Sequence, residues 1–367
     1  MPADGLDHVE IIIAGRAHSG WSRYEVDSDL LTPADAWSVS IDQERLSVPS
    51  VVRDAVTAQI KVGGDLVMTG YVDARAQSVR RGVQRLDLRG RDAAALLLDC
   101  SAPIFSAQDL TLGQVLTKIV RPLGISRMSI QADTQLLRDR VSIEPGETAW
   151  SALQRAAEAN GLWPWFEPDG TLVVGGPDYS VPPVANLVMR RDGQGNNVIE
   201  ATESALASER FSEVTVLGQA HGTVARDGRN AIKAVVRDTG MTVHRPRVLV
   251  DHEATNETLA NVRARKEITD ARVRGYELTL LVQGHRTAAG ALWTPGQRVH
   301  VEIEDLGING VFFLMARRFT GLPQFTTLTL REDGAWVLYA RPKSLKHKKV
   351  KGKKPAAVIV DVTGGVQ

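Results

Sequence analysis

The sequence contains very little cysteine. Cys100 is the one thiol among 367 residues, which excludes a disulfide framework within the chain and a zinc site built from cysteines. Synthesis in a reducing compartment is therefore expected. Cys100 itself is interpreted as a small buried hydrophobic residue and not as a reactive thiol.

Long apolar runs are also missing. No stretch approaches the roughly 18 consecutive apolar residues that a membrane-spanning helix requires. The first ten residues, MPADGLDHVE, are acidic where a signal peptide would be basic and then apolar. We therefore expect neither membrane insertion nor secretion. The composition, 43% hydrophobic and 24% charged, is that of a folded protein, and the length predicts roughly two or three domains.

Motifs of catalysis and of metal binding are not found. The eight histidines show no HxH or HExxH spacing, and there is no GxSxG elbow, Walker loop or GxGxxG between a strand and a helix. The densest titratable cluster, Asp251-His252-Glu253, is interpreted as a loop before a helix capped by Thr255, because three adjacent side chains point in different directions. The sequence predicts no catalytic residue, no cofactor and no metal ligand.

Charge is distributed unevenly along the chain. Residues 341–354 contain eight Lys or Arg and no acidic residue, whereas residues 1–340 carry 36 basic and 42 acidic residues, a formal charge of −6. Such an acidic body gives little support to tight binding of duplex DNA. The basic tail is either a solvated extension or a contact arm for an acidic partner or nucleic acid. Its candidate contact residues are Lys343, Lys346, Lys348, Lys349, Lys351, Lys353 and Lys354.

An apolar run follows this basic segment. Residues 356–362, AAVIVDV, are rich in strand-forming side chains. Such a run could add as a strand to the sheet edge of another chain.

Short β-strands dominate the first hundred residues. Alternating or apolar segments are separated by glycine turns such as Gly63-Gly64 and Arg81-Gly82. The pattern is typical of an antiparallel meander that closes as a barrel or sandwich. The expected strands are residues 9–14, 37–42, 57–62, 66–72, 74–80 and 83–89.

The pattern changes after Gly90. Asp92 is expected to cap a short helix over residues 93–98. Apolar residues at positions 112, 115, 116 and 119, behind a cap at Thr111, predict a second helix, and a third follows Thr148. Residues 163–175 then predict a hairpin that turns on Pro168-Asp169-Gly170. We interpret its aromatic group, Trp163, Trp165 and Phe166, as a core or subunit contact rather than a stacking platform for sugars or bases.

A second β-rich region follows a proline-rich linker at residues 177–183. Its clearest element is residues 292–319, where residues 298–303 alternate polar and apolar residues and residues 311–316 form an apolar second strand. Residues 257–274 predict a charged helix with a narrow stripe formed by Ala260, Ala264, Ile268 and Ala271. Other expected strands are residues 212–217, 232–237, 276–282 and 326–331.

These elements predict a mainly β protein with an α+β insert. The expected domains are residues 1–100, an α+β module at 101–180, a second β domain at 181–340 with an inserted segment at about 218–254, and a basic tail at 341–367.

Three stretches carry a family likeness. They are VGGDLVMTGYVD (62–73), LDLRGRDAAALLLDCSAP (86–103) and RGYELTLLVQGHRTAAGALWTPGQRVHVEIEDLGINGVFFLMARRF (274–319). With the helical module and the aromatic hairpin in the same order, they resemble the Mu-like bacteriophage baseplate hub family of the tail protein P type. This family is distantly similar to the hub domains of contractile-tail spikes and type VI secretion spikes. The likeness covers nearly all of residues 5–335.

The resemblance implies a fold and a set of partners. Each chain would contribute two tail-tube-like antiparallel β-barrel domains, and three chains would form a homotrimeric, pseudo-sixfold ring. That ring would join the hexameric tail tube to the central spike, contact baseplate wedge proteins and let DNA pass at infection. The protein would be assembled in the host cytoplasm and located in the virion tail.

Two other functions stay open at this stage. One is a cell-wall-degrading tail enzyme of the glycosidase type, since a catalytic carboxylate pair could be hidden among the 43 acidic residues. The other is a nucleic-acid-binding protein that uses the basic tail.

Overall fold

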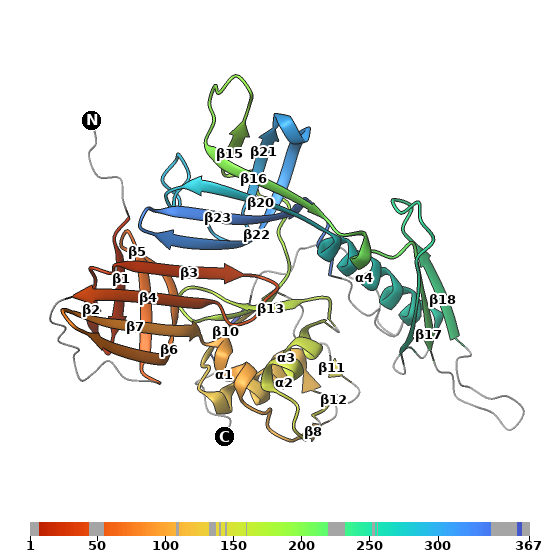
Figure 1. The fold of residues 1–367 in the computed structure, drawn as a ribbon. Helices are drawn as coiled ribbons and strands as arrows, with labels where there is room; N and C mark the ends of the chain where they lie inside the picture. Colours follow the sequence, from red (N-terminus) through yellow and green to blue (C-terminus); the bar gives the residue numbers. More distant parts are fainter. Residues whose placement is uncertain are drawn as a thin grey trace, which may run out of the picture.

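The structure is a computed structural model of the chain. It describes residues 7–43, 55–107, 110–131, 137–138, 141–143, 145–158, 160–218, 232–251, 254, 256–338 and 358–361. Two β regions lie against each other, with helices α1 to α3 beside the first and helix α4 leading away from the second (Figure 1). None of the helices in these ranges is long and apolar enough to cross a membrane.

The first β region is an antiparallel sheet in which alternating apolar residues place one face of most strands in the interior. In β1, for example, every second residue is buried. The region is not the simple meander predicted from the sequence, because two pairs of neighbouring strands are not consecutive in the chain. The strands are β1 (Val9–Ile13), β2 (Arg16–His18), β3 (Arg23–Asp29), β4 (Ala36–Gln43), β5 (Thr57–Val62), β6 (Asp65–Arg80) and β7 (Val83–Asp92).

The second β region contains the hairpin at residues 292–319. Its second strand is much longer than predicted, because it continues past the apolar run to pair with β3. The strands are β15 (Asn186–Met189), β16 (Val198–Ala205), β20 (Tyr276–Gln283), β21 (Arg298–Ile303), β22 (Ile308–Gly321) and β23 (Phe325–Glu332).

The two β regions form one sheet of 13 strands. The strand order along its main path is β16-β20-β23-β22-β3-β4-β7-β6-β5-β1-β2. In addition, β21 pairs with β22, and β15 pairs with β21. The mainly β class is therefore confirmed. Within the described residues the strand pairing does not close either region into a separate barrel, because β3, the edge strand of the first region, pairs with β22 of the second.

One apolar core extends under both regions. It contains Trp37 and Leu88 of the first region together with Leu280 and Phe319 of the second. All four side chains are almost completely buried. Burial of apolar surface thus stabilises the two regions as a unit.

The α+β module has its own core. The predicted helices are confirmed as α1 (Ala94–Asp99), α2 (Leu112–Val120) and α3 (Ala149–Glu158), and Thr111 caps α2 in a capping box with Gln114. Its sheet runs β13 (Trp163–Phe166), β14 (Leu172–Gly175), β10 (Arg127–Ile130) and β24 (Val358–Asp361). Smaller elements are η1 (Arg121–Leu123), β8 (Ser106–Ala107), β9 (Leu110–Thr111), β11 (Leu137–Arg138) and β12 (Val141–Ser142).

A further small unit follows η2 (Ala207–Glu209). It consists of β17 (Glu213–Gly218), β18 (Ile232–Arg237) and β19 (Pro246–Asp251), covered by α4 (Glu257–Gly275). The predicted alanine stripe is confirmed, since Ala260 and Ala264 are fully buried in a separate core with Val214 and Val216. The helix cap is Asn256 and not Thr255, because the Asn256 side chain accepts a hydrogen bond from the Leu259 amide. A short helix, η3 (Glu304–Leu306), turns the hairpin between β21 and β22.

Candidate assembly site

The join between β3 and β22 is the feature that unites the two β regions. The strands pair antiparallel from Ala316 opposite Asp29 to Gly321 opposite Tyr24. Backbone hydrogen bonds along this join replace what would otherwise be two exposed sheet edges.

A buried hydrogen-bond chain crosses the end of the join. The Tyr24 hydroxyl lies 2.8 Å from Nε2 of His285, and Nδ1 of His285 lies 3.0 Å from Oγ1 of Thr326. Burial lowers the pKa of His285 to about 4 and raises the pKa of Tyr24 to about 12. The histidine is therefore neutral at pH 7, as a buried hydrogen-bonding residue should be.

Arg317 is a charged residue buried at the centre of the join. Nη1 donates to the Val26 carbonyl oxygen at 3.0 Å, and the guanidinium lies 3.9 Å from the centre of the Phe319 ring. Burial lowers the pKa of Arg317 to about 10, although the carboxylates of Asp35 and Asp27 oppose this shift. The arginine thus keeps its charge and connects β22 to the first β region.

Two buried carboxyl groups lie near this arginine. Burial raises the pKa of Asp35 to about 7, and burial together with the neighbouring Asp35 raises that of Asp92 well above its usual value. Asp35 accepts a hydrogen bond from the Asp29 amide, and Asp92 accepts one from the Ala94 amide at 2.9 Å. The predicted helix cap is one residue off, because Ala93 is the N-cap of α1 and Asp92, directly before it, accepts the hydrogen bond from the first helical amide. Low dielectric and the neighbouring carboxyl group both favour the protonated form of Asp92.

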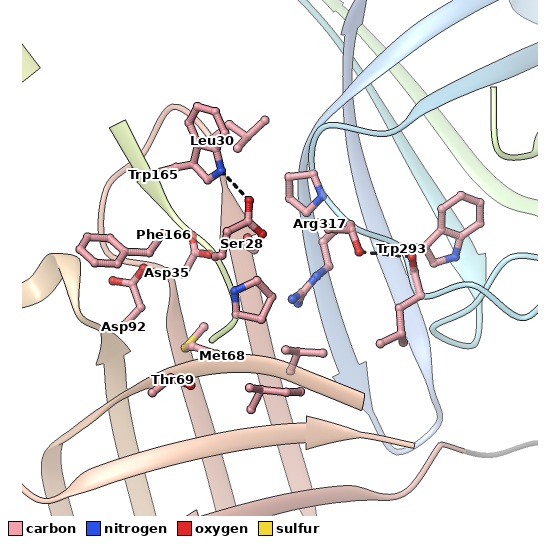
Figure 2. Close-up of a pocket in the computed structure, with 17 residues that line it drawn as sticks. Ser28, Leu30, Asp35, Met68, Thr69, Asp92, Trp165, Phe166, Trp293 and Arg317 are labelled. Atoms are coloured by element: carbon pink, nitrogen blue, oxygen red, sulfur yellow. Dashed lines mark hydrogen bonds between the residues drawn. The ribbon is translucent and has the colours of Figure 1, made fainter. Parts of the chain in front are cut away.

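These groups surround a small cavity between the modules (Figure 2). It has a volume of about 80 Å³ and is lined by Asp35, Asp92 and Arg317 together with Trp165 of the aromatic hairpin and Trp293 of the second β region. Arg317 points toward the side where Asp35 lies. The first β region, the α+β module and the second β region therefore meet around one cavity whose largely apolar wall carries the ionisable side chains of Asp35, Asp92 and Arg317.

The aromatic hairpin is part of this meeting point. Trp163 Nε1 donates to the Leu30 carbonyl oxygen at 2.6 Å, and its ring is edge-on to that of Trp336. Phe166 packs partly against the core of the α+β module. Trp163 and Phe166 thus make partly buried core contacts, whereas Trp165 lines the cavity, and a subunit contact stays a prediction.

Exposed apolar side chains mark a second candidate surface. Val235, Val248 and Val250 are 40%, 61% and 54% exposed. Val235 and Val248 lie on either side of Thr215 in register, on the face of the β18-β17-β19 sheet opposite α4. Exposed apolar groups clustered in this way are typical of a protein contact surface.

The remaining sequence candidates have different positions. The seven tail lysines lie outside the described residues, as do His252 and Glu253, while Asp251 ends β19. The run 356–362 is described at residues 358–361, which pair with β10 of the same chain. In the described part of the chain no three His, Cys, Asp or Glu residues are grouped as metal ligands.

Sequence reasoning missed the residues of the join. Asp27, Asp35 and His285 are isolated polar residues whose role depends on distant strands. Arg317 offered a signal, because it is a charged residue within the apolar strand VFFLMARRF, and such a residue needs a buried partner.

Family models match four successive parts of the chain. They are described as the Mu phage baseplate assembly protein GpP-like N-terminal domain (residues 8–92), the baseplate hub protein gp44-like second domain (94–176), the tail protein NMB1110-like third domain (210–268) and a tail protein C-terminal domain (270–335).

Known phage tail proteins resemble this protein in sequence and structure over most of the chain. The tail protein from Neisseria meningitidis MC58 is 38% identical, with a TM-score of 0.81 over 92% of this chain and all of that one. The chain belongs to the Mu-like baseplate hub family of phage tail proteins. Baseplate hub protein gp44 of Escherichia phage Mu is 23% identical over 83% of this chain and 81% of its own length. The 43 kDa tail protein of prophage MuSo2 from Shewanella oneidensis shares the fold, with 22% identity, a TM-score of 0.80 and coverage of 90% and 99%.

Proposed function

We propose that this hub protein forms a homotrimeric ring that joins a hexameric tail tube to a trimeric central spike. The single observation that carries the proposal is the join of two β regions into one sheet within each chain. Three such chains supply six β regions, which is the number needed to match a sixfold tube above a threefold spike. The family membership supports the same arrangement.

The charge of the body fits passage of DNA through the ring. Residues 1–340 carry a formal charge of −6. A lumen lined by such a body repels phosphates and therefore lets DNA move without strong binding. The basic tail is proposed as an arm that contacts spike or wedge proteins, and the protein acts without catalysis in the virion tail after assembly in the host cytoplasm.

The oligomeric state and shape of the full-length protein test this proposal. Native mass spectrometry at several concentrations, with and without the spike protein, should give the mass of three chains. Class averages from electron microscopy should show a closed ring with pseudo-sixfold symmetry. A protein that stays monomeric throughout and never joins spike or tube would contradict the proposal.

The glycosidase alternative predicts turnover of peptidoglycan. The buried Asp35 and Asp92 carboxyl groups are the strongest carboxylate candidates, because their raised pKa values are typical of general acids. A turnover assay with wild-type protein and the Asp35→Asn and Asp92→Asn variants distinguishes a glycosidase from a structural hub protein. We expect no activity above background for any of the three proteins; activity lost in both variants would favour the enzyme.

A further inference from the structure

One edge strand of the small sheet in the α+β module, β24, comes from the C-terminal region of the chain. β24 pairs antiparallel with β10, with Met128 opposite Val360 and Ile130 opposite Val358, and β14 pairs with β10 on its other side. Met128 and Ile130 are fully buried, so β10 is a core strand. Without β24 it would be an edge strand whose unpaired backbone groups attract a strand from another chain.

Residues 336–338, the last described residues before β24, lie beside this same sheet. Trp336 is buried, with its ring edge-on to that of Trp163 in β13. Leu338 lies next to Gly176, which follows β14 directly. From β14 to β24 the sheet spans two strand spacings, roughly 10 Å. The intervening residues, 339–357, could extend to about 60 Å.

We propose that β24 is exchanged between copies of the chain, so that the C-terminal strand of one subunit pairs with β10 of the next subunit. The inference rests on the proposed trimer. In a closed ring of three, each chain donates one strand and receives one, and no β10 edge stays unpaired. The occupant of the β10 edge is thus a second copy of this chain.

The length of the connecting segment favours exchange. A connection only a few residues long would hold β24 on its own β10, whereas one several times longer than the path within the chain reaches a neighbour as well. The entropic cost of closing a loop rises slowly with its length, so the longer reach costs little. The register and the backbone hydrogen bonds are the same for either chain.

The charge of the connecting segment favours the neighbour as well. Residues 341–354 carry eight basic and no acidic residues, and the body that they would cross has a formal charge of −6. Crossing from one acidic body to the next brings opposite charges together at each subunit boundary. Pairing between subunits would therefore strengthen the ring through both backbone hydrogen bonds and charge.

Disulfide trapping between two differently tagged copies tests the exchange. Ser129 of β10 lies opposite Ile359 of β24. In a Cys100→Ser background, one full-length copy carries Ser129→Cys and the other Ile359→Cys, and the two are co-expressed and then oxidised. We expect a covalent heterodimer on a non-reducing gel that reducing agent removes, because the two thiols meet only when β24 of one copy pairs with β10 of the other.

A matched pair controls for random encounters. Ser151 is an exposed residue on α3, and Ser151→Cys combined with Ile359→Cys in the second copy should give no heterodimer. Equal cross-linking of this control pair would overturn the exchange.

A third variant separates exchange from pairing within one chain. It carries Ser129→Cys and Ile359→Cys in the same copy, and native mass spectrometry reports its oligomeric state. An intact trimer in which both thiols join only within single chains would overturn the exchange and leave the hub function standing. A protein that is monomeric and joined only within the chain would overturn both.

Discussion

At the scale of single residues, glycines decide where strands can approach closely. A Cβ atom on Gly90 of β7 would lie 1.9 Å from the Tyr71 carbonyl oxygen and 2.6 Å from the ring of Trp37, a buried residue of the common core. In contrast, a Cβ on Gly113 of α2 would meet Ile130 at an ordinary 3.6 Å.

These two positions give opposite predictions for alanine. Gly90→Ala should lower the free energy of unfolding by about 3 kcal/mol or more, because neither the backbone oxygen nor the indole can move aside. Gly113→Ala should raise it by about 0.5 to 1 kcal/mol, since alanine is the better helix former. Urea unfolding followed by circular dichroism measures both. A neutral Gly90→Ala would show that the packing at β7 is looser than described.

Asp92 gives a prediction about pH. Its pKa in the folded protein is raised above that of the unfolded chain, mainly by burial. A raised carboxyl pKa contributes stability that is present at low pH and is lost as the pH rises from about 4 through the folded value. Asp92→Asn removes this loss and keeps an oxygen for the Ala94 amide. The variant should melt at a higher temperature than wild type at pH 8 and at a similar one at pH 4.

Differential scanning fluorimetry across this range measures the difference. Glu200→Gln, at an exposed position in β16, serves as the control and should follow the wild-type profile. A variant at position 92 that is less stable than wild type at pH 8 would contradict the account of a carboxyl group destabilised by burial.

At the scale of elements, the sequence predicts local structure better than pairing. The helices were predictable because their caps and apolar stripes are local, as at Thr111 in α2. β6 was expected as two strands, but it is one strand with a register shift between Val72 and Ala74, which explains the apparent break. β3 was missed because three of the seven residues in RYEVDSD are acidic, and β16 because most of its residues are exposed.

The candidate site was even less accessible from sequence. The join depends on Tyr24 of β3, Arg317 of β22 and His285 in the loop after β20, which come together only in the folded protein. Tyr24 and His285 lie in segments without a distinctive pattern, and Arg317 indicates burial by its apolar surroundings but not which strand it contacts. Only the acceptor role of Asp92 was predictable, because helix capping is a local interaction.

The histidine of the join predicts how stability responds to acid. The folded pKa of His285 is lowered to about 4, mainly by burial, from an ordinary value of 6.5. Protonation then favours the unfolded chain, so stability falls as the pH drops from about 6.5 toward 4. His285→Gln should flatten this part of the profile, whereas His244→Gln, at an exposed position, should leave it unchanged. Unfolding in urea between pH 7 and 4 measures the slope.

At the scale of the whole molecule, charge separates body and tail. With an acidic body, we expect weak retention of the protein on duplex DNA at 150 mM salt. Any retention at low salt should disappear when the seven tail lysines are replaced by glutamine, because it depends on phosphate contacts. Filter binding at several salt concentrations measures this. Strong retention that survives both high salt and the lysine substitutions would require a DNA-binding surface on the body.

The pairing of β3 with β22 also determines when the sheet can be completed during synthesis of the chain. Arg317 and its acceptor Val26 are 291 residues apart in the chain, so a ribosome has synthesised most of the protein before β3 can find its partner. Until then the first β region has an open edge at β3, and contacts so distant in sequence form slowly. A product truncated before β22 keeps that edge exposed and cannot offer two joined β regions. Only a chain that extends past β22 can therefore complete the sheet.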